Sequence, residues 1–453
     1  MKTGEFSPWN NAREVIEGMW KADSLRGRFA RGAVWSLAGA LSTQGSNLAA
    51  SVITARLLGT EEFGEFGIIQ STVGTLGIFA GMGLGVTATK YVAEYRLQDP
   101  ERAGRIVALG AGAALFSGAL MALCLVIWAP ELASRTLSRP GLSGELRIAG
   151  VLLFLNAVNG AQMGALSGFE AFRTIARINF IRGLTTLPIA ATAVFYWKLP
   201  GAVWALCATS AVACLLSQIA LRRHCGDLGI RLRLADGWAE RRVLWTFSTP
   251  AFLSGALAGL AIWAANAMLV NQPAGYSEMG VFNAASQWRN AISFLPLVLT
   301  QFALPVLSSL NAERDVSRYG KALRWNLIIT AGAAILAALP VALASGFIIE
   351  LYGSGFEGGR VVLVIAAATA VVSCINGVVG TAIFSSGSVW AGLLFNTLWA
   401  AALLGSAYYF IPLSPAIGLA AAMLLAYVCH TFWQGVYLAR VVPARLRQCP
   451  GRA

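Results

Sequence analysis

Between Arg360 and Arg440 the sequence reads VVLVIAAATAVVSCINGVVGTAIFSSGSVWAGLLFNTLWAAALLGSAYYFIPLSPAIGLAAAMLLAYVCHTFWQGVYLA, without one Asp, Glu, Lys or Arg. A membrane-spanning helix needs about 20 consecutive, mainly apolar residues, so this stretch has room for three of them. Turn-forming residues interrupt it twice, at 385–388 (SSGS) and at 412–415 (PLSP). The stretch therefore predicts three membrane spans, at 361–384, 389–411 and 416–439.

Charged residues limit similar apolar runs in the rest of the 453-residue chain. Only 12% of the residues are charged and 57% are hydrophobic, whereas a soluble domain is about 25% charged. This composition excludes a soluble enzyme, a disordered chain and a coiled coil, and the continuous runs disfavour an outer-membrane barrel, whose strands alternate. We expect an all-α polytopic membrane protein with about twelve transmembrane helices. The nine further spans lie between Arg31 and Arg56, Glu65 and Lys90, Arg105 and Glu131, Arg147 and Glu170, Arg182 and Lys198, Lys198 and Arg222, Arg242 and Glu278, at 279–309, and between Arg324 and Glu350.

The basic residues of the loops predict the orientation of the chain. With twelve spans and a cytoplasmic N-terminus, the cytoplasmic segments hold 27 Lys and Arg residues and the opposite side holds 6. Loops rich in Lys and Arg stay on the cytoplasmic side, so we expect both termini in the cytoplasm. The same rule explains the net charge of +13 without a nucleic-acid partner.

The spans divide into two equal sets. A basic loop at 223–242 separates six spans from six, which predicts two six-helix lobes related as parallel repeats around a central cavity. A short echo supports the repeat, because EFGEF at 62–66 and EMGVF at 278–282 enter the second and the eighth span. The basic loop has two readings, a topological determinant or a docking site for anionic lipid or a glycosyltransferase. The expected divisions are a cytoplasmic tail at 1–32, an N-lobe at 33–222, the linker at 223–242, a C-lobe at 243–439 and a basic cytoplasmic tail at 440–453.

The eighth span carries a polar stripe. At about 100° per residue, Asn283, Gln287 and Asn290 share one face, and Ser293 and Arg289 lie to one side of it. Amides between helices often serve only as hydrogen-bonding glue, and Arg289 has the alternative of reaching outward to an interface. An arginine near the middle of a membrane costs about 2.5–3.5 kcal/mol on insertion scales, which favours a stripe that lines a water-filled, substrate-binding cavity.

Further polar residues recur inside or at the ends of the spans. Because the middle of each predicted span lacks Asp and Glu, a cation or drug antiporter with a buried carboxylate is disfavoured. Arginine and amide groups suit an anionic substrate instead. Two histidines and no CxxC motif give no reason to expect a metal site. The remaining cavity candidates are Gln44, Asn47, Asn156, Asn159 and Asn266 within spans, with Arg56 and Lys90 at span ends.

Several short motifs, in order along the chain, resemble one family of membrane proteins. The sequence is similar to bacterial polysaccharide and O-antigen flippases, members of the multidrug/oligosaccharidyl-lipid/polysaccharide (MOP) superfamily. The resemblance covers the span count, the lobes and the loop lengths. The motifs are ARLLG at 55–59 with FG at 63–64, GLG at 83–85 with KYVAE at 90–94, GFEAFR at 168–173, and QWR at 287–289 with Pro296 and LPVLS at 304–308.

The resemblance implies a transporter without a catalytic site or a resident cofactor. It implies that the chain flips an undecaprenyl-diphosphate-linked oligosaccharide across the bacterial inner membrane by alternating access, for O-antigen, capsule or exopolysaccharide synthesis. It also implies contact with membrane lipid, a polysaccharide polymerase and glycosyltransferases, and it leaves H⁺ or Na⁺ coupling open. The alternatives are a multidrug or small-solute antiporter of the same superfamily and a membrane-embedded sugar transferase or ligase. The transferase would need catalytic acids, and no loop is long enough for a catalytic domain.

Overall fold

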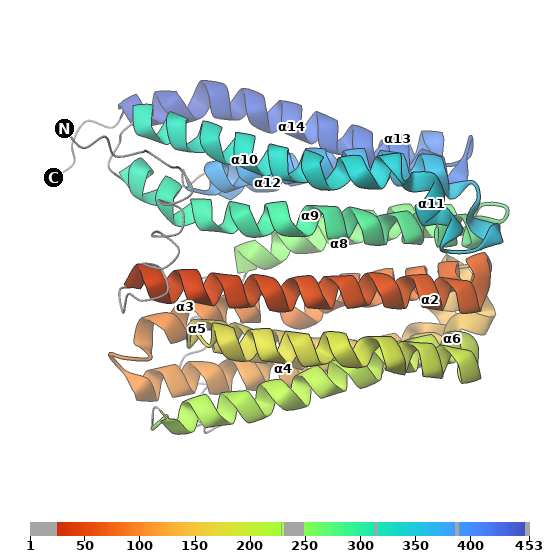
Figure 1. Ribbon diagram of the computed structural model, residues 1–453, viewed down its shortest axis with the longest axis horizontal. Coiled ribbons are helices and arrows are strands. Elements are labelled where there is room, and N and C mark those ends of the chain that lie inside the picture. Colours follow the sequence, from red (N-terminus) through yellow and green to blue (C-terminus); the bar gives the residue numbers. More distant parts are fainter. Residues whose placement is uncertain (1–24, 228, 231–248, 313–315, 386–388, 449–453) are drawn as a thin grey trace, which may run out of the picture.

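The computed structural model describes residues 25–227, 229–230, 249–312, 316–385 and 389–448. Within these ranges the chain is helical and contains no strand. The long helices run side by side in two groups, with α2 to α6 in one and α8 to α14 in the other (Figure 1). The α-helices are α2 (Leu25–Gly81), α3 (Leu84–Tyr95), α4 (Pro100–Glu131), α5 (Ser143–Gly168), α6 (Phe172–Asp227), α8 (Thr249–Val270), α9 (Gly275–Ala312), α10 (Val316–Leu343), α11 (Ser345–Glu350), α12 (Gly359–Ser385), α13 (Val389–Phe410) and α14 (Pro415–Gln448).

Two of these helices are hairpins of two antiparallel arms. The backbone leaves the helical region at Gly59 in α2 and at Lys198 in α6. The contacts confirm the reversal in α2. Thr43 on its first arm contacts the carbonyl of Asn179, and Ser71 on its second arm accepts a hydrogen bond from Asn266 of α8. With each hairpin counted as two arms, the described residues contain the twelve expected spans.

The two reversals stand at the same end of the molecule. Lys198 donates from Nζ to the carbonyl oxygen of Leu57 at 3.0 Å, so the turn of α6 touches the turn of α2. We call this end of the bundle the far end, and the end that holds Leu25 and Gln448 the terminal end. The far end also carries η1 (Leu132–Thr136), η2 (Pro140–Leu142), α11 and η5 (Ser354–Phe356).

Glycine at position 59 is required by the backbone of the reversal. Its φ of 77° and ψ of −179° lie in a region that residues with a Cβ rarely enter. We expect Gly59→Ala to destabilise the protein by about 1–3 kcal/mol. Thermal unfolding in detergent, followed by size-exclusion chromatography, measures the effect. Gly45→Ala on the first arm is the matched control, because nothing lies within 4 Å of the added Cβ. Equal midpoints for the two variants would contradict the prediction.

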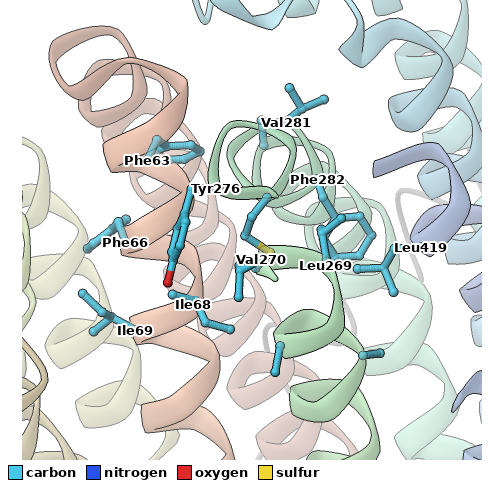
Figure 2. Packing of buried hydrophobic residues seen from close by; sticks show 14 of the residues in the cluster. Phe63, Phe66, Ile68, Ile69, Leu269, Val270, Tyr276, Val281, Phe282 and Leu419 are labelled. Atoms are coloured by element: carbon cyan, nitrogen blue, oxygen red, sulfur yellow. The ribbon is translucent and has the colours of Figure 1, made fainter. Parts of the chain in front are cut away.

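The largest hydrophobic cluster joins the two lobes at the far end. Phe63 of α2 packs against Tyr352 and Phe356, with ring centroids 6.4 and 6.0 Å away. Figure 2 shows Phe63 and Ile68 on the side of α2 that faces Leu269, Val270 and Phe282 of α8 and α9, and Phe66 on the opposite side of α2. The twelve-helix, two-lobe architecture predicted from the sequence is therefore confirmed. Most of the 223–242 linker and residues 1–24 and 449–453 lie outside the described residues.

Candidate functional site

The lobes touch through their main chains at the far end. A Cβ built on Gly64 would overlap the carbonyl oxygen of Tyr276, and one built on Gly280 would overlap the carbonyl oxygen of Thr60. Only glycine allows backbones to approach so closely. Next to them, a Cβ on Gly67 would lie 2.9 Å from the Asn283 amide carbon. The far end is therefore closed by direct backbone contact between α2 and α9.

A polar latch reinforces this closure. Arg139, between η1 and η2, places Nη2 at 2.9 Å from Glu61 Oε1 and at 2.8 Å from Glu65 Oε1. The nearby carboxylate of Glu65 raises the pKa of Arg139. Across the lobe boundary, the guanidinium lies 5.6 Å from the ring centroid of Tyr276, whose hydroxyl donates to the carbonyl of Leu137 at 2.6 Å. We call Arg139, Glu61, Glu65 and Tyr276 the far-end latch.

A second set of hydrogen bonds crosses the same boundary. Asn271, at the end of α8, accepts from Ser138 Oγ at 2.5 Å and donates to the carbonyl of Thr136 at 2.8 Å. Arg56 of α2 also donates to the carbonyl of Glu350 at 3.4 Å. These bonds join the loop after α4 and the turn of α2 to the second lobe, so the far-end closure has several independent attachments.

Toward the terminal end the first arm of α2 and α9 become exposed. On α2, Ser51 is buried, and Asn47, one turn further along the same face, is exposed. On α9, Asn283 is buried against α2, Gln287 is half-buried and Asn290 is exposed. Gln44 is half-buried on the face that carries Asn47. The amides of α2 and those of α9 therefore each form a stripe along their helix. Each stripe begins near the contact between the lobes and becomes exposed toward the terminal end.

The second arm of α2 stays attached to α8 in the same region. Asn266 donates to Ser71 Oγ at 2.8 Å, Trp263 Nε1 donates to Thr72 Oγ1 at 3.0 Å, and Thr75 Oγ1 donates to the carbonyl of Gly259 at 3.2 Å. Closer to the terminal end, the rings of Phe79 and Phe252 lie 5.4 Å apart. These contacts hold the second arm of α2 against α8 from the far end toward the terminal end.

A cavity of about 480 Å³ lies between α2, α3, α5 and α8 toward the terminal end. Its α2 wall is made of glycines at three- and four-residue spacing, Gly74, Gly77 and Gly81. Asn156 of α5 lines it, and because Asn156 Oδ1 accepts from Ser210 Oγ at 3.0 Å, the amide N–H groups are left for the cavity. The first turn of α3 also lines it, with no side chain capping that helix at Gly83. The free N–H groups of a helix start carry positive partial charge.

Comparison with known proteins settles the family. Residues 29–311, more than half of the chain, match the family of polysaccharide biosynthesis proteins. The chain belongs to this family. The MOP-superfamily resemblance seen in the sequence motifs is therefore confirmed, and the protein is a membrane transporter of this family and not an enzyme.

Two curated relatives cover much of the polysaccharide biosynthesis protein. The EPS I polysaccharide export inner membrane protein EpsE of Ralstonia nicotianae is 24% identical over 94% of this chain and 97% of its own length. The lipid III flippase of Escherichia coli is 24% identical over 64% of this chain and 69% of its own length. The fold is similar to the inward-facing structure of a multidrug-resistance MATE transporter of the MOP superfamily. The TM-score is 0.74 at 15% identity, over 92% of this chain and 100% of that one.

The remaining predicted site residues lie in three environments: between helices, at helix ends and inside the C-lobe. Asn159 donates to Ser217 at 3.1 Å and Asn266 donates to Ser71 at 2.8 Å. Each of these hydrogen bonds holds two neighbouring helices together. Arg56 and Lys90 are exposed at helix ends, and Lys90 lies 4.7 Å from the ring centroid of Tyr91.

Arg289 and Ser293 point into the second lobe. The Arg289 guanidinium contacts the sulfur of Met423 on α14, and Ser293 is buried against Cys374 of α12. The structure thus separates these two from the face that carries Asn283, Gln287 and Asn290. A thioether is only a weak acceptor and carries no charge, so Met423 does not neutralise the arginine.

Sequence reasoning missed Arg182, which lies on the first arm of α6. Arg182 is half-buried, and the next residue, Gly183, packs against Thr43 of α2. A guanidinium within a membrane-spanning helix costs free energy, so Arg182 is a candidate for a functional role. The sequence signal that could have identified it is a single arginine between two apolar runs. Among the described residues, no group of three His, Cys, Asp or Glu side chains is placed to hold a metal ion.

Proposed function

We propose that this protein flips a polyprenyl-diphosphate-linked oligosaccharide across the bacterial inner membrane. The observation that carries the proposal is the backbone closure at the far end, from which two helix faces with amide side chains lead toward the terminal end. We propose that these faces border a cleft between the lobes, lined by Gln44, Asn47, Gln287 and Asn290. Amides donate and accept hydrogen bonds, as the hydroxyl groups of a sugar do. The names of the relatives, a polysaccharide export protein and a lipid III flippase, support the same cargo class.

The diphosphate requires positive charge near the cleft. Arg289 and Arg182 are half-buried within helices of opposite lobes, and neither pairs with a carboxylate among the described residues. A guanidinium binds phosphate with two parallel hydrogen bonds. We assign Arg289 the main role in binding the diphosphate and Arg182 a supporting one. This role requires the Arg289 guanidinium to leave Met423 and turn out of the C-lobe during the cycle. Asn283, Ser293, Asn156, Asn159, Asn266, Arg56 and Lys90 complete the proposed site, the last two at its edges.

The closure at the far end supports alternating access as the mechanism. In the proposed cycle the latch and the glycine contacts at the far end break while the cleft toward the terminal end closes, so that the cargo head group crosses between rigid lobes. The excess of Lys and Arg, 27 against 6, supports cytoplasmic termini, which makes the terminal end the cytoplasmic face. The lobes 33–222 and 243–439 would be the moving units. The tails 1–32 and 440–453 would remain in the cytoplasm, where the linker 223–242 would join the lobes and meet glycosyltransferases.

Deletion of the gene is expected to remove surface polysaccharide and to leave lipid-linked oligosaccharide on the cytoplasmic face. The reason is that the chain offers a pathway for the cargo and no catalytic domain that could make it. Glycan staining of intact cells and extraction of the lipid-linked pool measure both effects. Unchanged surface polysaccharide in a strain without a second flippase gene would show that the proposal is wrong. Loss of drug efflux in the same strain would favour the multidrug antiporter.

A further inference from the structure

The C-lobe contains a buried polar cluster that the proposed cargo path does not use. On α14, Tyr427, His430 and Gln434 follow one another at spacings of three and four residues and so lie on one face. His430 is 7% exposed and Gln434 is 5% exposed. Asn376 of α12 and Trp399 of α13 pack against this face, with 6% and 3% exposure. We call these five residues the C-lobe cluster.

Hydrogen bonds and ring contacts connect every member of the cluster. Asn376 Nδ2 donates to the carbonyl of Tyr427 at 3.0 Å. The ring of Trp399 lies 5.4 Å from that of Tyr427 and 6.4 Å from that of His430. The amide nitrogen of Gln434 lies 2.9 Å from Nε2 of His430. Three helices of one lobe therefore meet at this cluster, where Trp399 and Gln434 contact the imidazole itself and Asn376 contacts the backbone of Tyr427.

Four polar atoms of the cluster are buried and have no hydrogen-bond partner. They are Asn376 Oδ1, Trp399 Nε1, His430 Nδ1 and Gln434 Oε1. Buried polar groups are normally satisfied, so four unsatisfied atoms around one side chain indicate a site that is filled or rearranged during function. Because Gln434 donates to Nε2, the neutral imidazole carries its hydrogen on Nδ1. The unpaired atoms are then two donors and two acceptors, a set that suits water and protons.

The pair of His430 and Gln434 can serve both protonation states. When a proton from water adds to the Nε2 lone pair, an N–H bond forms there and the hydrogen bond from the Gln434 amide nitrogen breaks. A half-turn of the amide then presents Gln434 Oε1, which lacks a partner in the present arrangement, as the acceptor for the new N–H group. Release of the proton reverses these steps, so Nε2 of His430 keeps Gln434 as its hydrogen-bond partner in both states.

We propose that His430 is a proton-binding site and that its loading and release couple the lobes to a proton gradient. The coupling to transport rests on the proposed function, whereas proton binding by His430 does not. Histidine is the side chain whose charge changes near neutral pH. In the conformation described, Nε2 of His430 faces the amide nitrogen of Gln434, which can only donate, and this is the arrangement of a neutral imidazole. Binding of the proton then belongs to a conformation in which water reaches the C-lobe cluster.

The surroundings favour a proton over a metal cation. The charged group of α9 nearest the C-lobe cluster is Arg289, which contacts Met423 of α14. Helix α14 itself contributes the phenol of Tyr427 to the cluster. Asn376 and Trp399 are uncharged, α8 has no titratable residue, and from α10 the phenol of Tyr319 donates to Ala382 further along. No carboxylate among these contacts would balance Na⁺ beside an arginine. The nitrogen of an imidazole, in contrast, is a good acceptor for a proton.

The chain has only two histidines, which allows a direct test of the site. Protein labelled with ¹³C at histidine Cε1 and placed in lipid nanodiscs should give two resonances. His224, 3.2 Å from Thr174 at the terminal end, is assigned with His224→Gln, and this variant is the matched control. The expected result is a His430 resonance that moves between its neutral and charged positions between about pH 4 and pH 8. A resonance that stays neutral throughout would overturn the proton site, whatever the protein transports.

Transport measurements then test the coupling. Proteoliposomes with lipid-linked oligosaccharide are compared with and without a gradient of about one pH unit, which supplies up to about a tenfold driving ratio per proton. We expect the gradient to accelerate wild-type and His224→Gln flipping, whereas the ratio of the two rates falls to about one in His430→Gln and His430→Asn. An undiminished ratio in both His430 variants, or acceleration by a Na⁺ gradient alone, would refute proton coupling. If no cargo moves under any condition, the proposed function fails and the resonance alone decides the site.

Discussion

Gly64→Ala is expected to lower flipping by about 5- to 150-fold, because the added methyl group would occupy the place of the Tyr276 carbonyl oxygen. Overpacking of a tight contact costs about 1–3 kcal/mol, and 1.4 kcal/mol is a factor of about ten in an equilibrium. The cost falls on the conformation that is closed at the far end, so the population shifts toward the open one. Gly280→Ala should act in the same way through the Thr60 carbonyl.

Flipping in proteoliposomes measures the loss, and the reactivity of a cysteine placed at Phe356 with a membrane-impermeant reagent measures the opening. Phe356 is 1% exposed and packs against Phe63 across the closed boundary, so the reactivity of the cysteine should rise in Gly64→Ala. Gly346→Ala is the matched control, because this glycine also lies in a far-end helix and a Cβ there meets nothing within 4 Å. Wild-type flipping by Gly64→Ala would mean that the far end is not closed during the cycle.

Arg289→Ala is expected to insert and fold normally and yet to lower glycan export by about 10- to 100-fold. The alanine removes a group that is costly inside a membrane, so stability should not fall through loss of charge. Hydrogen bonds to charged groups contribute about 1.5–3 kcal/mol, which sets the expected loss of export if the guanidinium binds the diphosphate. Arg289→Lys should keep part of the activity, because lysine retains the charge without the planar fork.

Export of surface glycan at matched membrane expression is the measurement for Arg289. Arg135→Ala is the control, since this arginine is 80% exposed in its side chain and pairs only with Glu131 of its own helix turn. Because Arg289 contacts Met423, Met423→Leu separates substrate binding from packing of the lobe. An export defect in Met423→Leu as large as in Arg289→Ala, or none in Arg289→Ala, would remove Arg289 from the substrate site.

The fold was predictable because the membrane restricts it. Backbone groups inside lipid must be satisfied within each helix, so apolar run lengths and the positions of charges were enough to find twelve spans. The hairpins of α2 and α6 follow from the same counting, since Gly59 and Lys198 lie where the sequence placed the ends of apolar runs. The contribution of glycine to the far-end closure was less visible. EFGEF and EMGVF marked the right positions as a repeat, but not as surfaces that touch.

Helical periodicity predicted which residues share a face, but not what that face meets. Asn283, Gln287 and Asn290 do share one face of α9. Along this face the side chains change from buried against α2 at Asn283 to exposed at Asn290. Arg289 lies about 120° from Asn283 on the helical wheel, far enough to turn into the C-lobe. The Arg139 latch depends on a loop after α4 reaching α2 and α9, and no local pattern specifies such a long-range contact.

The glycine contacts at the far end have a practical consequence for redirecting this carrier to a new cargo. Closure there uses the main chains of α2 and α9, at Gly64 and Gly280, while the amides that border the cleft stand further along the same helices. A library that randomises Gln44, Asn47, Gln287 and Asn290 therefore leaves the closing surfaces untouched. Variants with altered glycan preference should be obtainable from such a library by selection on surface polysaccharide, without rebuilding the moving parts.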